Sequence, residues 1–186
     1  NLKIVDMLKL EIHAERNQWL TAHKRNNDPS FESHRQHIFA RDKNQCQFCG
    51  FIATVHQQII NLNHDYRDNR PENMATACVF CEQCHFLEMC GLLEYGGGTV
   101  IYLPEISKNE LNGLAHTAFC ANHSDPEHQA NAKNIYQTLK LRAKPVEKKF
   151  GKGMGRPSLL GQVMIDTPCE KSQIIQDMKS QLRLLP

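Results

Sequence analysis

The chain has 186 residues, of which 40% are hydrophobic, and its 22 lysines and arginines nearly balance its 20 aspartates and glutamates. This length fits one domain with at most a small appendage, and the apolar content excludes intrinsic disorder as the main state. The formal net charge of +2 is too small to indicate nucleic-acid binding by the whole chain. No apolar run of roughly 18 residues is present to span a membrane. Charged residues within positions 1–12 exclude a signal-peptide core there.

The first half of the chain predicts short elements. Apolar and charged residues alternate over 8–12, which predicts a half-buried strand, and the pair at 19–20 suggests a second strand. After a polar loop at 26–30, apolar residues mark one face of a helix that ends near 42.

The second half predicts longer elements. A glycine turn precedes a β segment over 99–103. Ser107 opens a helix with the spacing of a capping box, and apolar residues then recur at helical spacing over 111–119. A further helix begins at Asp125 and is expected to end at Pro145.

Two pairs of cysteines are the strongest chemical signal. Cys46 and Cys49, followed by Gly50, form one Cys-x-x-Cys pair, and Cys78 and Cys81 form the other. Such spacing lets a tight turn point two sulfurs at one ion, and two pairs supply the four soft ligands that suit tetrahedral Zn²⁺. We therefore predict one structural zinc ion. Paired cysteines without an export signal indicate a reducing compartment, here a cytoplasm.

The remaining cysteines are weaker candidates. Cys84 makes a third overlapping pair and can replace one of the four ligands, although a buried neighbour is the favoured interpretation. Cys90, Cys120 and Cys169 have no partner at ligand spacing. Cys120 lies beside the apolar stripe of a predicted helix, which indicates a small core residue.

Three further histidines offer a second metal site. His116, His123 and His128 lie close together in the sequence, but their spacing is irregular for metal binding. Solvated histidines are the favoured interpretation.

The segment between the cysteine pairs resembles the HNH, or ββα-metal, nuclease motif in its zinc-knuckle frame. Asn63-His64 follows an apolar run, Asn73 lies in the next loop, and His85 comes four residues after Cys81. In such a nuclease, His64 would act as general base for a water, with Asn73 and His85 completing the catalytic group.

Two observations argue against that chemistry. Asn63 supplies a neutral amide where the motif has a metal-binding carboxylate, so a hard cation would bind weakly. Between Cys46 and Glu94, two arginines stand against six acidic residues, a net charge of −4. A nuclease must approach a polyanion, and this field opposes it. We therefore expect an HNH scaffold without its reaction, and keep a metal-dependent HNH endonuclease as the alternative.

A longer resemblance is carried by the segments 46–51, 76–84, 95–105, 134–136 and 163–166, which together extend over most of the chain. These segments resemble the IcmJ/DotN family of Dot/Icm type IVB secretion systems. This resemblance implies a non-enzymatic zinc-binding adaptor on the cytoplasmic face of the bacterial inner membrane. It implies docking on a C-terminal segment of the coupling ATPase DotL, with other coupling-complex subunits, to support effector recruitment and translocation. Membrane association would be peripheral and through partners.

Two surfaces are candidates for binding. The stretch 140–156 contains seven lysines and arginines against one glutamate, a charge of +6. It is either a solvated helix end or a patch for an acidic partner, an anionic lipid surface or nucleic acid. The other candidate is a strand within 91–102 that would pair with an extended peptide.

Taken together, these patterns predict an α+β fold with an HNH-like ββα-metal core and a four-cysteine zinc knuckle, surrounded by helices. Apolar residues over 174–185 predict an amphipathic C-terminal helix. The predicted domain organisation is a single zinc-containing domain over 1–144 with its zinc module at about 41–90, a flexible Gly/Pro/Lys linker over 145–157, and a C-terminal helical extension over 158–186.

Overall fold

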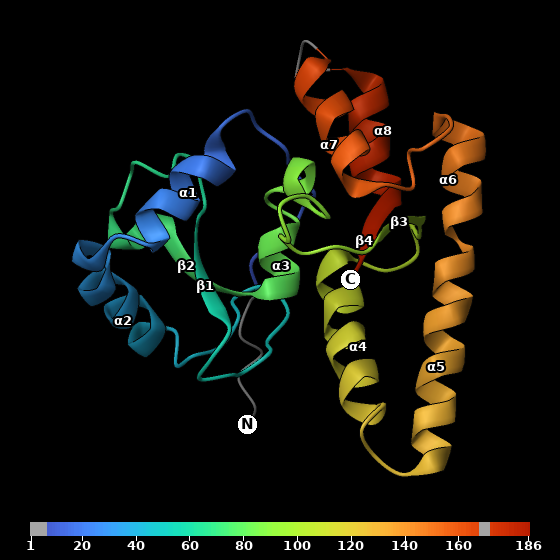
Figure 1. Ribbon diagram of the computed structural model, residues 1–186, viewed down its shortest axis with the longest axis horizontal. Coiled ribbons are helices and arrows are strands. Elements are labelled where there is room, and N and C mark those ends of the chain that lie inside the picture. Colours follow the sequence, from blue (N-terminus) through green and yellow to red (C-terminus); the bar gives the residue numbers. More distant parts are fainter. Residues whose placement is uncertain (1–6, 168–171) are drawn as a thin grey trace.

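The computed structural model describes residues 7–167 and 172–186 and combines helices with two small antiparallel sheets (Figure 1). Strand β1 (Gln57–Asn61) pairs with β2 (Met74–Cys78), and β3 (Thr99–Tyr102) pairs with β4 (Leu182–Leu185). This mixture confirms the α+β class.

Helices make up most of the regular structure. They are α1 (Gln18–Asn26), α2 (Glu32–Arg41), α3 (Val79–Gln83), α4 (Lys108–Ala121), α5 (Pro126–Leu141), α6 (Ala143–Phe150), α7 (Pro157–Asp166) and α8 (Gln173–Gln181). Three 3₁₀ turns lie at Pro29–Phe31, Pro71–Asn73 and Leu87–Met89. Of the helices in the described ranges, none combines the length and apolar character that a membrane span requires.

The first sheet leads directly into a helix. β1 and β2 run antiparallel with Gln57 opposite Cys78, and α3 begins at the next residue. Helix α2 packs against β2, where Arg41 donates to the carbonyl oxygen of Met74 and the Asp42 carboxylate accepts from the backbone N–H of Thr76 at 2.9 Å. These bonds satisfy polar groups at the edge of a buried strand.

The second sheet joins distant parts of the chain. β3 lies in the middle of the sequence and β4 near its C-terminal end, and α6 packs against β3. The hairpin of α4 and α5 lies beside this sheet, and α5 and α6 follow one another along one edge of the molecule (Figure 1). One buried apolar cluster contains Ile60 from the first sheet, Val100 from the second, and Val146, Leu160 and Leu184.

Helix α4 begins as predicted. The Ser107 side chain accepts from the backbone N–H of Glu110, and the Glu110 carboxylate accepts from the backbone N–H of Ser107 at 2.7 Å. This reciprocal capping box satisfies donors that a helix start otherwise leaves free. The predicted helix up to residue 42, the strand at 99–103 and the helix start at Asp125 are also confirmed.

The N-terminal strand predictions are wrong. Residues 8–12 have no regular secondary structure, although Leu10 and Ile12 are buried, and they pair with no strand of the described chain. The backbone N–H groups of Leu8 and His13 instead donate to the carbonyl oxygens of Gln47 and Cys84, which lie in turns. The predicted second strand at 19–20 lies within α1.

Two C-terminal predictions also need correction. Helix α8 ends at Gln181, and the last apolar residues of the predicted helix form β4, because pairing with β3 satisfies their backbone groups. Pro145 does not end a helix: α5 stops at Leu141, and Pro145 lies in the first turn of α6, where its missing N–H costs little. The division into a domain, a linker and an extension stays a prediction.

Candidate metal centre

The four predicted ligand cysteines come together. The Sγ atoms of Cys46, Cys49, Cys78 and Cys81 all lie within 4.8 Å of one another. In the described ranges, no other group of at least three histidine, cysteine, aspartate or glutamate side chains is arranged to hold a metal ion. The arrangement is compatible with one tetrahedral Zn²⁺.

Local backbone geometry positions both pairs. The first pair lies in a tight turn, in which the Gly50 N–H donates to the Cys46 carbonyl oxygen at 3.0 Å and Gly50 has a φ of 79°. Few residues other than glycine adopt this conformation readily. In the second pair, Cys78 ends β2 and Cys81 lies in α3, so the strand-to-helix junction turns both sulfurs the same way.

The close approach of the sulfurs has an electrostatic consequence. Cys49 and Cys78 place their Sγ atoms 3.5 Å apart. Hydrogen bonding from Cys46 lowers the pKa of Cys49, whereas bonding to Cys46 raises the pKa of Cys81. Four thiolates this close together would repel one another, and a bound divalent cation would offset that repulsion.

Helix α4 supplies two polar contacts to the sulfurs. His116 Nε2 lies 3.1 Å from the Sγ of Cys78, and the amide of Asn112 donates to the Sγ of Cys81 at 3.3 Å. An N–H donor stabilises a thiolate, and such donors around metal ligands tune the affinity of the site. Sequence reasoning missed Asn112, and it considered His116 only for a separate metal site. The available signal was their spacing of four, which places them on one helix face.

The imidazole of His116 is held between two aromatic rings. Its centroid lies 3.7 Å from that of Phe51, at an interplanar angle of 2°, and 4.3 Å from that of Phe80. The prediction of a solvated histidine is therefore wrong for His116, because these rings and the thiol cover it. His123 and His128 are exposed, and His128 contacts the Asp125 carboxylate.

The other cysteines divide into buried and exposed. Cys84 lies outside the four-sulfur group, and burial raises its pKa to about 12, so its thiol stays protonated. Cys90 is buried and its thiol faces the carbonyl oxygen of Gln83. Cys120 is exposed, which corrects its prediction as a core residue: the apolar face of α4 turns away from it. Cys169 lies outside the described residues.

The two histidines of the nuclease-like motif, His64 and His85, lie close to a third histidine, His13. His64 stacks on His13 with centroids 3.7 Å apart and lies 5.4 Å from His85. Burial lowers the pKa of His85 to about 3 and that of His13 to about 4, and it also lowers the pKa of His64. Neither ring nitrogen of His85 has a hydrogen-bond partner among the described residues. The three rings are therefore neutral at physiological pH.

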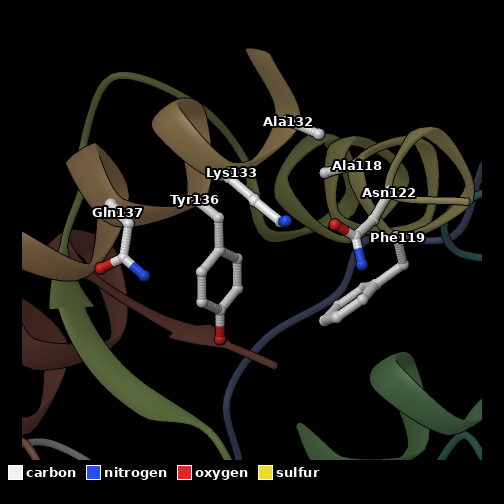
Figure 2. Close-up of a pocket in the computed structure, with 7 residues that line it drawn as sticks. All are labelled: Ala118, Phe119, Asn122, Ala132, Lys133, Tyr136 and Gln137. Atoms are coloured by element: carbon white, nitrogen blue, oxygen red, sulfur yellow. The ribbon is translucent and has the colours of Figure 1, made fainter. Parts of the chain in front are cut away.

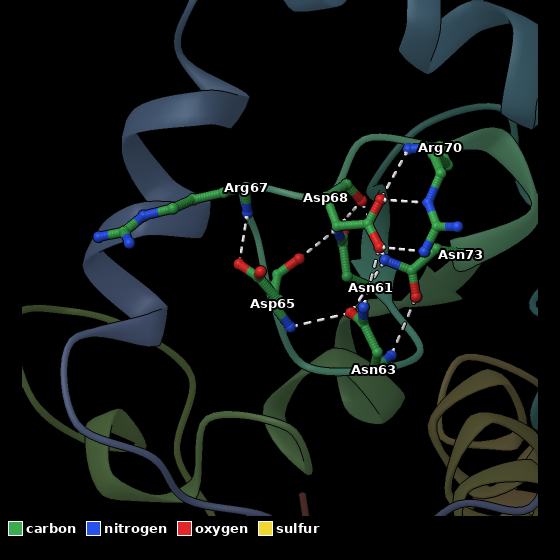
Figure 3. A network of polar contacts seen from close by, with 7 residues as sticks. All are labelled: Asn61, Asn63, Asp65, Arg67, Asp68, Arg70 and Asn73. Atoms are coloured by element: carbon green, nitrogen blue, oxygen red, sulfur yellow. Dashed lines mark hydrogen bonds and ion pairs between the residues drawn. The ribbon is translucent and has the colours of Figure 1, made fainter.

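Asn63 and Asn73 tie the loop after β1 together (Figure 3). The Asn63 Oδ1 accepts from the Asp65 N–H at 2.9 Å and from the Asn73 amide at 2.9 Å, while the Asn73 Oδ1 accepts from the Asn63 N–H. Asp68 accepts from the Asn63 amide and pairs with Arg70, which lowers the pKa of Asp68 to about 2. Both asparagines thus serve as tethers of the loop that carries His64.

The chain has a clear relative among characterised proteins. It is 45% identical over 178 residues to the "Type 4 apparatus protein DotN" of Legionella pneumophila subsp. pneumophila, strain Philadelphia 1. The aligned region covers 96% of this chain and 83% of that protein. No family model matches the chain.

Proposed function

Because the chain belongs to the DotN family of type 4 apparatus proteins, we propose that it is a component of a Dot/Icm type IV secretion system. The single observation that carries this proposal is the 45% identity over nearly the whole chain. Within that system, we assign it the role of a non-enzymatic adaptor that holds a structural zinc ion.

The four-cysteine group supports the zinc assignment. The ligands would be Cys46, Cys49, Cys78 and Cys81, and a thiolate-only shell leaves no open position for catalysis. The expected result of elemental analysis is one tightly held zinc per chain, lost in Cys46→Ser and retained in Cys120→Ser, whose thiol is exposed. Zinc-free protein from a metal-replete preparation would contradict the assignment.

The order of elements around the cysteines supports an HNH-like core. Two antiparallel strands lead into α3, the ring centroids of His64 and His85 lie 5.4 Å apart, and Asn73 bonds to the loop that carries His64. We propose that this unit is a scaffold that has lost its reaction.

Three observations favour a scaffold over a nuclease. Asn63 is a loop tether, so its oxygen is already bonded. One face of the His64 ring is covered by His13. The surrounding module is acidic, which opposes a nucleic-acid backbone.

Incubation with plasmid DNA and Mg²⁺, Mn²⁺ or Ni²⁺ tests the alternative endonuclease. The adaptor assignment predicts intact substrate. Metal-dependent cleavage that disappears in His64→Ala would establish the nuclease instead.

We further propose that the protein works on the cytoplasmic face of the inner membrane, attached through partners. The proposed partners are the C-terminal segment of a DotL-type coupling ATPase and other coupling-complex subunits, and the proposed outcome is effector translocation. Affinity purification of the tagged chain from a host that encodes the system tests this. Recovery of the coupling ATPase is expected, and its absence when other apparatus components are recovered would contradict the assignment.

A further inference from the structure

A row of lysines runs along the outer edge of α5 and α6. The buried side of the two helices is continuous, which shows that they follow a nearly common axis. The buried or half-buried residues on that side are Ala132, Leu139, Val146 and Phe150. Four lysines share a different side of the two helices: Lys133, Lys140, Lys144 and Lys148.

These four lysines, which we call the lysine row, carry free charge. All four are at least partly exposed, and none has an ion pair within the described part of the chain. The nearby carboxylates interact with groups other than these lysines. Glu105 pairs with Arg142 at 2.8 Å, and Glu147 accepts from the backbone N–H of Gly153 at 3.2 Å. At 1.5 Å per residue, the row is about 22 Å long.

One end of the lysine row borders a small apolar pocket between α4 and α5 (Figure 2). The pocket measures about 210 Å³, and Lys133 belongs to both features. Phe119 is 43% exposed, and its ring centroid lies 5.9 Å from that of Tyr136. The residues around the pocket are Ala118, Phe119, Asn122, Ala132, Lys133, Tyr136 and Gln137.

The size and walls of this pocket suit one side chain. Its volume is below the roughly 300 Å³ at which small-molecule sites begin. The Oδ1 atom of Asn122, at one wall, is buried and has no hydrogen-bond partner among the described residues. The Tyr136 hydroxyl donates to the carbonyl oxygen of Pro186 at 2.7 Å, which fixes the wall in place.

We propose that the pocket and the lysine row together bind an acidic segment of a partner protein that carries one aromatic or aliphatic anchor. The anchor fills the pocket, and the carboxylates lie along the row. A flat lipid surface would use the charge but not a recessed pocket, and a nucleic acid would meet the opposing field of the acidic module. The inference rests on the proposed adaptor function, for which it names a docking surface and a class of partner.

Fluorescence polarisation with labelled synthetic peptides tests the proposal. The first probe has one Phe beside six Glu residues, the second has Gly in place of Phe, and the third has Gln in place of Glu. The wild-type chain is expected to bind the first probe about tenfold more tightly than either of the others. Equal binding of all three probes would overturn the proposal.

Two variants test separately how the lysine charges and the pocket contribute to peptide binding. Lys140→Glu/Lys144→Glu/Lys148→Glu should weaken binding of the first probe at least tenfold, as mutated rim charges do for complementary partners. Ala118→Leu fills the pocket and should abolish the preference for Phe over Gly while keeping the preference for Glu over Gln.

The matched control carries the same change in charge on other exposed residues, Lys24→Glu/Lys43→Glu/Arg67→Glu, and should bind within about twofold of wild type. A control variant that weakens binding as much as the row variant would overturn the proposal. So would lysine-dependent binding of phosphatidylglycerol vesicles or of an oligonucleotide without binding of the peptide.

The peptide-binding experiments and the purification of apparatus components can fail separately. If the row variant still recovers the coupling ATPase from its host, and the peptides bind indifferently, the docking surface is wrong and the adaptor assignment stands. If the peptides bind as expected but no apparatus component is recovered, the adaptor assignment falls.

Discussion

His116 links a helix to the sulfur cluster through one hydrogen bond. Its Nε2 lies 3.1 Å from Cys78, and the rings of Phe51 and Phe80 hold it there. A donor of this kind, fixed by packing, affects how tightly the thiolates retain an ion more than whether they gather.

We expect His116→Ala to lower zinc affinity by about 10- to 100-fold, because the thiolate of Cys78 loses its donor. His116→Gln, which keeps an N–H group, should recover part of that loss. Competition with a chromogenic chelator measures the affinities. His123→Ala, at a position outside the sulfur cluster, is the control. Equal affinities for all four proteins would show that the contact has no role in metal retention.

His85 makes stability sensitive to acid. Its pKa is lowered by burial from 6.5 to about 3. Above pH 6.5 the imidazole of His85 is neutral in both the folded and the unfolded chain. As the pH falls below that value, only the unfolded chain takes up a proton, so stability falls by up to about 1.4 kcal/mol per pH unit until the folded form also protonates.

In His85→Leu, this contribution is removed. The free energy of unfolding, measured with urea between about pH 7 and pH 5, should fall less steeply for the variant than for wild type. Both proteins keep the four cysteines, so acid release of metal affects them equally. Parallel pH profiles would mean that His85 protonates freely in the folded protein.

At the scale of elements, glycine permits two close approaches. Gly98, directly before β3, has a φ of 107°, and a Cβ there would collide with the carbonyl oxygen of Leu185 in β4. Gly161 lets α7 lie on the 3₁₀ turn Leu87–Met89, and a Cβ there would collide with the backbone of Glu88.

We expect Gly161→Ala to cost about 1–3 kcal/mol, because the clash is with backbone and α7 must move away from the turn. The matched control is Gly97→Ala, since a Cβ at Gly97 meets nothing within 4 Å. Urea unfolding midpoints compare the two variants with wild type. A Gly161→Ala variant as stable as the control would show that α7 is not held against this turn.

Sequence patterns anticipated the elements whose signals are local. The cysteine pairs, the capping box of α4 and the strand at 99–103 each depend on neighbours within a few residues. Helix α1 and strand β4 were missed because tertiary packing decides them: β4 exists only through β3, some 80 residues earlier. The contacts of Asn112 and His116 with the sulfurs were missed for the same reason, because they require α4 to fold back on the four cysteines.

For the whole molecule, β4 holds the middle of the chain to its end. Leu182, Leu184 and Leu185 are buried, and Tyr136 bonds to the carbonyl oxygen of Pro186. Burial of such side chains contributes about 1.5–3 kcal/mol each, which is a large share of the stability of a domain this size.

Deletion of residues 182–186 should therefore abolish cooperative unfolding of the C-terminal half, since it leaves β3 unpaired. Leu184→Ala should cost about 2–5 kcal/mol, whereas the conservative Leu184→Met should cost less than about 1.5 kcal/mol. Thermal unfolding followed by circular dichroism distinguishes these outcomes. A cooperative transition in the truncated chain, at the wild-type temperature, would contradict the prediction.

Helix α4 contributes residues both to the surroundings of the four cysteines and to the pocket beside the lysine row. Asn112 and His116 contact the sulfurs, and Ala118 and Phe119, less than a turn further on, form part of the pocket beside the lysine row. The Phe119 ring also lies 5.6 Å from that of Phe80, next to Cys81. Any thermodynamic coupling between these places must be reciprocal: a ligand that tightens metal binding by some factor is itself bound more tightly by that factor when the metal is present. Zinc occupancy would then serve as a readout of whether a partner is engaged.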